Sequence, residues 1–106
     1  MTNPDGMAPL FLFLPGSETL GATGAAPEAD RVIIAVDCAD RKRLGEAAEK
    51  WNRVPDVNID HHVSNPGYAR LNIVDPASPA TAQVLYEIIE ALRWPLTAEI
   101  AANLYV

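Results

Sequence analysis

The chain has 106 residues, and 49% of them are hydrophobic, which is enough to fill one small core and excludes a disordered tail. Eight basic against fourteen acidic residues give a formal net charge of −6, which disfavours sequence-independent nucleic-acid binding through broad phosphate neutralisation. A phosphorylated substrate is compatible with this charge where bound cations reverse the local field.

Residues 1–30 are expected to form an irregular lead-in that is rich in prolines and small residues. The apolar run at 10–14 is too short to cross a bilayer, and no basic residue precedes Arg31. We therefore expect neither a signal peptide nor a membrane partner. Cys38 is the only cysteine, which excludes an intrachain disulfide and makes a reducing cytoplasm the expected location.

Residues 31–106 are expected to form an α/β core with C-terminal helices. The apolar run "RVIIAVD" (31–37) predicts a strand buried on both faces, as in a parallel sheet. Asp40 is then placed to cap a helix. The helical spacing of the apolar positions that follow supports this helix: Leu44, Ala47, Ala48 and Trp51. "VPDVNID" (54–60) predicts a second strand, and "YARLNIVD" (68–75) predicts a third strand at the sheet edge.

Two helices are expected after these strands. Ser78 followed by Pro79 predicts an N-cap and a first helical residue, and Pro95 predicts the end of that helix. Thr97 predicts the cap of a last helix. The first of these helices has an expected buried stripe: Val84, Leu85, Ile88, Ile89 and Leu92. Strand, helix, strand, then helices is the order of an α/β fold with a parallel sheet.

Two groups of polar residues stand at predicted strand ends, where ligands collect in such sheets. These are Asp37 and the triplet Asp60-His61-His62, which one crossover would bring side by side. An imidazole and a carboxylate there suit a divalent cation. Neighbouring residues of an extended chain point to opposite sides, so one histidine is expected to bind metal and the other to serve substrate or proton transfer. Asp60 could orient an imidazole, while hydrogen bonding and helix capping are the simpler alternatives.

The segments "VDCADRKRLG" (36–45) and "NIDHHVSNPG" (58–67) resemble the DHH phosphoesterase family. Its members include single-strand exonucleases, oligoribonucleases that also act on 3′-phosphoadenosine 5′-phosphate, cyclic-dinucleotide phosphodiesterases and manganese pyrophosphatases. Residues 3–18, 74–89 and 101–106 are similar to segments of the oligoribonuclease branch, so the resemblance covers nearly the whole chain.

The resemblance implies a Rossmann-like domain and a role for each residue of the site. Asp37 matches an acid that bridges two Mn²⁺ ions, and His61 matches the metal-binding imidazole. His62 matches the catalytic neighbour that faces the scissile phosphate and contacts substrate. Asp60 is assigned to the catalytic group as the residue that orients an imidazole, and Asn65 to substrate binding at the rim.

The sequence departs from the family pattern in two places. A first motif of the form H-x-x-x-D-x-D is not identifiable, since Met1 and Met7 stand where a histidine and an aspartate belong. A fourth motif with a further aspartate is not found either. We therefore expect residues 1–106 to form a partial DHH domain, without the first strand and its motif, the fourth motif and the C-terminal domain. Such a piece would offer one weak metal site at most and show little or no activity.

The function implied by the resemblance is manganese-dependent phosphoester hydrolysis through a water activated by two metals. The expected substrates are short oligonucleotides or 3′-phosphoadenosine 5′-phosphate, and a homodimer is expected for the full-length parent. Two alternatives stay open: a pyrophosphatase or cyclic-dinucleotide phosphodiesterase of the same family, and a non-catalytic nucleotide-binding module. A closed zinc site is disfavoured because the cysteine and the two histidines lack ligand spacing.

Overall fold

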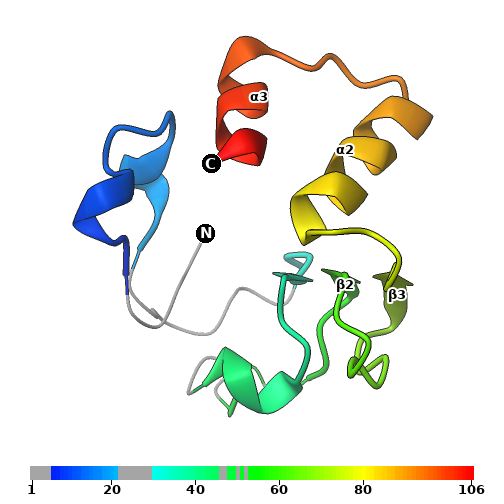
Figure 1. Cartoon of the computed structure of the whole chain (residues 1–106). Helices are drawn as coiled ribbons and strands as arrows, with labels where there is room; N and C mark the ends of the chain where they lie inside the picture. The colour runs from blue at the N-terminus through cyan, green and yellow to red at the C-terminus, as the bar shows by residue number, and fades with distance from the viewer. Residues whose placement is uncertain (1–5, 22–29, 46–47, 50, 52) are drawn as a thin grey trace.

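The computed structural model describes residues 6–21, 30–45, 48–49, 51 and 53–106. Three parallel strands form a sheet in the order β1-β2-β3, and two helices lie on one of its faces (Figure 1). The strands are β1 (Ile34–Val36), β2 (Val57–Asp60) and β3 (Leu71–Val74), and the helices are α2 (Thr81–Ala91) and α3 (Ala98–Tyr105). The predicted α/β class with a parallel sheet is confirmed.

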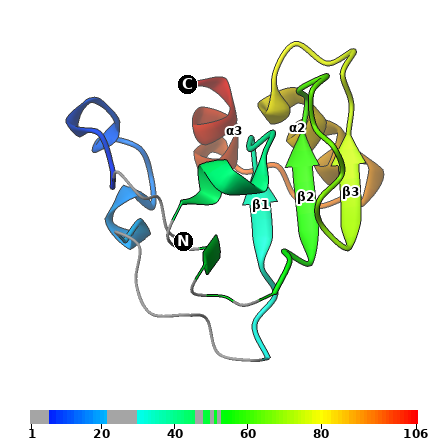
Figure 2. The same cartoon turned by 90° about the horizontal axis from the view of Figure 1, so that it is seen from below.

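The lead-in contains two short 3-10 helices, η1 (Pro9–Phe11) and η2 (Ser17–Thr19). Residues 6–21 lie to one side of the sheet in both views (Figures 1 and 2) and meet α3 where the Asn103 amide donates to the Pro15 carbonyl at 3.2 Å. The rest of the predicted lead-in, 1–5 and 22–29, lies outside the described residues, and the division at residue 30 stays a prediction. Among the described helices, none has the length and apolarity to span a membrane.

The parallel register brings the carboxyl ends of all three strands to one edge of the sheet (Figure 2). Val36 pairs with Ile59 in the ladder, and the Asp37 N–H donates to the Ile59 carbonyl at 3.0 Å, one residue beyond β1. Asp37 thus stands beside the end of β2. The predicted edge position of β3 is confirmed.

The prediction that the first strand is buried on both faces is wrong. Ile33 and Ala35 are buried, but Ile34 and Val36, on the opposite face, are 55% and 45% exposed. The reason lies in the packing of α2, which lies against β2 and α3. Ile59 of β2 and Val84 of α2 are buried where the helix covers the sheet. The apolar face of β1 is left open beside this contact.

The segment after β1 begins with a 3-10 turn, η3 (Arg41–Leu44), and Ala48 and Glu49 are helical. The predicted cap is confirmed, because the Asp40 carboxylate accepts a hydrogen bond from the Lys42 N–H at 2.9 Å. Gly45 follows with a φ of 61°, a left-handed conformation that favours glycine and ends the turn. Ala48 is buried as expected, whereas Ala47 lies outside the described residues.

The predicted start of α2 is two residues too early. Ala80 is the N-cap and Thr81 the first helical residue, because the Ser78 hydroxyl donates to Asp75 instead of capping. Leu92, expected in the buried stripe, is 52% exposed and follows the end of the helix. The Thr97 cap of α3 is confirmed by its hydrogen bond from the Ile100 N–H at 3.2 Å.

Asp56 joins the starts of β1 and β2 at the edge of the sheet opposite the site. Its Oδ2 accepts a hydrogen bond from the Ile33 N–H at 2.9 Å, and guanidinium nitrogens of Arg53 and Arg70 lie 3.8 and 3.5 Å from its carboxylate. The Ile33 hydrogen bond lowers the pKa of Asp56. Desolvation opposes this shift, and the two guanidinium groups reinforce it. The charged carboxylate is therefore the form that the folded chain favours.

We expect Asp56→Asn to destabilise the fold in a pH-dependent way. Because the folded pKa of Asp56 lies below the ordinary value of 3.8, its charge contributes fully above that value and the contribution is lost as pH falls through the folded pKa. The variant should unfold at a lower urea concentration than wild type at about pH 7, and the gap should shrink when the pH is lowered below 3.8. Urea titrations followed by circular dichroism measure both gaps. Equal gaps at the two pH values would contradict the electrostatic explanation.

Candidate metal centre

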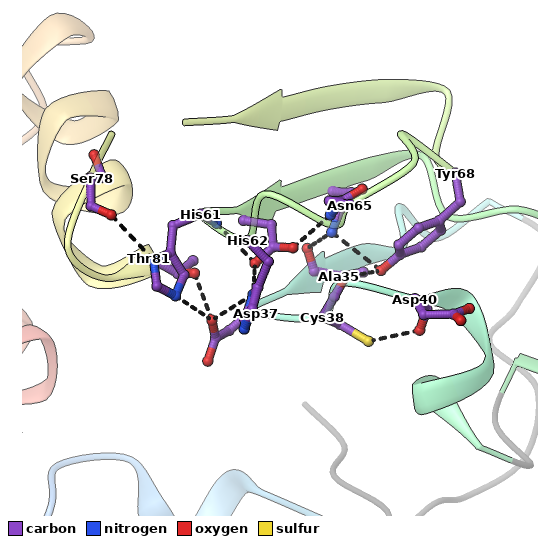
Figure 3. Close-up of polar contacts among 12 residues, drawn as sticks. Ala35, Asp37, Cys38, Asp40, His61, His62, Asn65, Tyr68, Ser78 and Thr81 are labelled. Carbon is purple, nitrogen blue, oxygen red and sulfur yellow. Dashed lines mark hydrogen bonds and ion pairs between the residues drawn. The ribbon is translucent and has the colours of Figure 1, made fainter. Parts of the chain in front are cut away.

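Three side chains from two strand ends converge at the carboxyl edge of the sheet (Figure 3). Asp37 follows β1, while His61 and His62 follow β2, and each offers one ligand atom within 4.8 Å of the others. The Nε2 atom of His61 and the Nδ1 atom of His62 both lie 3.9 Å from Oδ1 of Asp37. The structure therefore brings together the acid and the imidazole that the sequence placed at adjacent strand ends.

Asp37 reaches this position through an uncommon backbone conformation. Its φ is 53°, in the left-handed region, where aspartate is tolerated better than most residues other than glycine. The residue thus leaves the strand direction, and its side chain is 61% exposed. The Thr81 hydroxyl at the start of α2 donates a hydrogen bond to Oδ1 of Asp37 at 2.7 Å. The carboxylate is held from the helix side while remaining open to solvent.

The two histidine rings do not point to opposite sides, so that expectation is wrong. Their centroids lie 4.6 Å apart with the ring planes tilted by 58°. The reason is that β2 ends at Asp60, so both histidines lie beyond the strand, where the alternation of side chains no longer applies. Which histidine binds metal and which contacts substrate stays a prediction.

Asp60 is fully buried beneath the histidines, and three hydrogen bonds satisfy its carboxylate. Oδ1 accepts from the His61 N–H at 2.8 Å and contacts Nδ1 of His62 at 2.7 Å, while Oδ2 accepts from the Asn65 amide at 2.6 Å. Burial raises the pKa of Asp60, but the hydrogen bonds from His62, Asn65 and the backbone outweigh it, and the net pKa lies below its usual value. Asp60 is therefore a buried carboxylate that stays charged.

The hydrogen-bond partners fix the tautomer of each neutral imidazole. Nδ1 of His62 faces the Asp60 carboxylate, and Nδ1 of His61 lies 3.2 Å from the Ser78 carbonyl oxygen. Because both partners can only accept, each Nδ1 carries the hydrogen and each Nε2 keeps a lone pair. This is the arrangement by which acceptors usually orient metal-binding histidines.

Asn65 supports this network from the loop after the histidines. Its amide nitrogen donates to Asn58 at 2.7 Å as well as to Asp60, and its oxygen accepts from the Gly67 N–H at 2.9 Å. These hydrogen bonds occupy both ends of the side chain and make it a support for Asp60. The predicted contact of Asn65 with substrate stays a prediction.

A second tier of polar residues, which the sequence analysis missed, connects the network to the other strand end. The fully buried Asn58 amide donates to the Tyr68 hydroxyl at 3.2 Å, and Tyr68 donates to the Cys38 carbonyl at 2.9 Å. Desolvation raises the pKa of Tyr68, so the hydroxyl stays protonated and can donate. The contact fixes the backbone next to Asp37. An asparagine inside an otherwise apolar strand was the available signal for this tier.

Thr81 and Ser78 were also missed as parts of the site, because the segment "SPATA" reads as a helix start. A pocket of ≈ 330 Å³ opens beside the cluster, between the sheet edge and the two helices. Polar and apolar side chains share its lining, among them Val36, Asp37, His61, Thr81, Leu85 and Leu104.

Comparisons with known proteins identify the family of the chain. NrnA from Thermus thermophilus, described as a bifunctional oligoribonuclease and PAP phosphatase, is 37% identical over 95 residues, covering 88% of this chain and 28% of that protein. An uncharacterized protein from Mycoplasma pneumoniae is 30% identical over 105 residues, covering 88% of this chain and 32% of that protein. The chain thus spans about a third of the length of these curated relatives. Residues 4–106 match the N-terminal domain of the DHH family, and the chain belongs to that family.

Proposed function

We propose that this chain supplies a divalent-metal site to a phosphoesterase that hydrolyses short oligonucleotides or small phosphorylated nucleotides such as 3′-phosphoadenosine 5′-phosphate. The observation that carries the proposal is the convergence of Asp37, His61 and His62 at one edge of the sheet. Membership of the DHH family and the printed activities of the Thermus relative support the same reaction class.

The donor set fits a divalent cation. One carboxylate and two imidazoles approach each other, and each imidazole is oriented through its Nδ1 by an acceptor. We propose Mn²⁺ because carboxylate and water oxygens suit this ion. Imidazole, the second kind of ligand in the site, is common for other first-row transition metals such as iron. Asp37 and His61 would be the protein ligands.

His62 is proposed to act on the substrate. Its Nδ1 is held by the Asp60 carboxylate at 2.7 Å, so Nε2 is left to contact a phosphoryl oxygen or to carry a proton. When bound, the cation would supply positive charge that activates a water and neutralises phosphoryl oxygens. Asp60 keeps His62 in one tautomer and does not itself reach the substrate, since it is fully buried.

The charge of the chain is consistent with a cation-dependent substrate site. At a net charge of −6, a nucleotide phosphate meets a repulsive field unless positive charge is placed beside it. Of the three donors that the described residues bring together, Asp37 and His61 would hold one ion weakly, whereas a two-metal site needs bridging and further terminal ligands. We therefore propose that the chain by itself has little or no activity.

We expect Asp37→Asn and His61→Gln each to weaken Mn²⁺ binding about tenfold or more, because each removes a direct donor. Isothermal titration calorimetry or the electron paramagnetic resonance signal of free Mn²⁺ measures the affinity. The matched control is Asp40→Asn, which changes a carboxylate of the same loop that caps η3 through Lys42. Equal losses in the control and in Asp37→Asn would show that general negative charge, and not the cluster, binds the ion.

We expect slow, Mn²⁺-dependent cleavage of a dinucleotide when the chain is in excess over substrate, and its loss in His62→Gln. The glutamine cannot exchange a proton with the substrate, although it keeps a similar size. Mononucleotide release is followed by chromatography, with pyrophosphate and a cyclic dinucleotide as competing substrates. Rapid multiple turnover by the chain alone would contradict the proposal of an incomplete site, and cleavage that His62→Gln leaves unchanged would contradict the role of His62.

A further inference from the structure

We propose that Thr81 is a positioning residue that holds the Asp37 carboxylate in the orientation facing the two histidines. The proposal rests on the metal site of the proposed function and adds a residue to it. The Thr81 hydroxyl donates to Oδ1 of Asp37 at 2.7 Å, across 44 positions of sequence (Figure 3). This hydrogen bond joins the end of β1 to the start of α2.

Among the described residues, the Asp37 carboxylate is the partner to which the Thr81 hydroxyl donates. Ala80 is the N-cap of α2, and no side chain caps the helix. The Thr81 side chain is buried, with 4% exposure, and branching at Cβ limits its rotamers. The donor is thus fixed in place by packing before it meets Asp37.

Asp37 needs such a partner, because little else restrains its side chain. The side chain is 61% exposed, so packing alone leaves it more than one staggered χ1 rotamer. Among the described residues, Thr81 is the one whose side chain lies within hydrogen-bonding distance of this carboxylate, since both histidine nitrogens stand 3.9 Å away. Binding Oδ1 selects one orientation, and no side chain in the part of the chain that the structure describes donates a hydrogen bond to Oδ2.

The same connection between β3 and α2 also orients His61. The Ser78 carbonyl contacts Nδ1 of His61 at 3.2 Å, only three residues before Thr81. The segment from Ser78 to Thr81 therefore orients one side chain at the end of β1, Asp37, and one after the end of β2, His61. His61 is held by a backbone atom, which substitution leaves in place, whereas Asp37 is held by a side chain, so Thr81 is where the arrangement can be tested.

The experiment compares Thr81→Val, which replaces the hydroxyl by a methyl group of similar size, with Thr81→Ser, which keeps the hydroxyl. Three-bond couplings between Hα and Hβ of Asp37 report its rotamer in the metal-free 106-residue chain. Wild type and Thr81→Ser should show one rotamer, and Thr81→Val should show averaged couplings. Thr97→Val is the control, because Thr97 also stands at a helix start but its hydroxyl accepts a hydrogen bond from Ile100 of its own helix.

Mn²⁺ titration is the second readout. We expect the dissociation constant to rise about tenfold in Thr81→Val and to change by less than about threefold in Thr81→Ser, the size seen for partners of metal ligands. A single Asp37 rotamer in Thr81→Val overturns the inference. If wild type binds no Mn²⁺, the proposed function fails, while the couplings still decide the role of Thr81. Should Thr81→Val not fold, Thr81→Ala against Thr81→Ser gives the same decision.

Discussion

The site depends on one buried carboxylate, that of Asp60 at the end of the central strand. A charged group with no exposed surface costs several kcal/mol unless hydrogen bonds replace its water. The His61 N–H, the His62 ring and the Asn65 amide supply these hydrogen bonds, and all three come from the five residues that follow. The chain after β2 must therefore fold back over Asp60, and this return places both imidazoles at the sheet edge.

Parallel pairing converts this local arrangement into a site shared by two strands. Because β1 and β2 are parallel and end at the same edge, their pairing brings Asp37 beside the histidines. Two supports then fix it from opposite faces of the sheet. Thr81 reaches its carboxylate from the helix side, and Tyr68 holds the carbonyl of the next residue, Cys38, from the other side. The buried polar residues around Tyr68 and the helix start at Thr81 thus both help to position Asp37.

The strands, their parallel order and the meeting of Asp37 with the histidines could be predicted, because apolar runs closed by acids report directly on strand ends. The exposure of Ile34 and the late start of α2 could not, since both depend on what packs nearby and on competing hydrogen bonds of Ser78. The side-by-side histidines escaped prediction because alternation holds only inside a strand, and β2 stops one residue before them. The role of Thr81 is invisible in sequence, since its partner lies 44 positions away.

The left-handed backbone of Asp37 restricts which residues evolution can place there. Glycine and asparagine adopt a φ of 53° readily, but glycine lacks a ligand and asparagine lacks the charge. Glutamate carries the charge, but it adopts this left-handed conformation less readily. Its side chain is also one methylene longer, so its carboxylate would extend past the threonine hydroxyl. Aspartate alone combines tolerance of this backbone conformation, the required side-chain length and a negative charge. Almost every substitution at this position is therefore expected to impair the site.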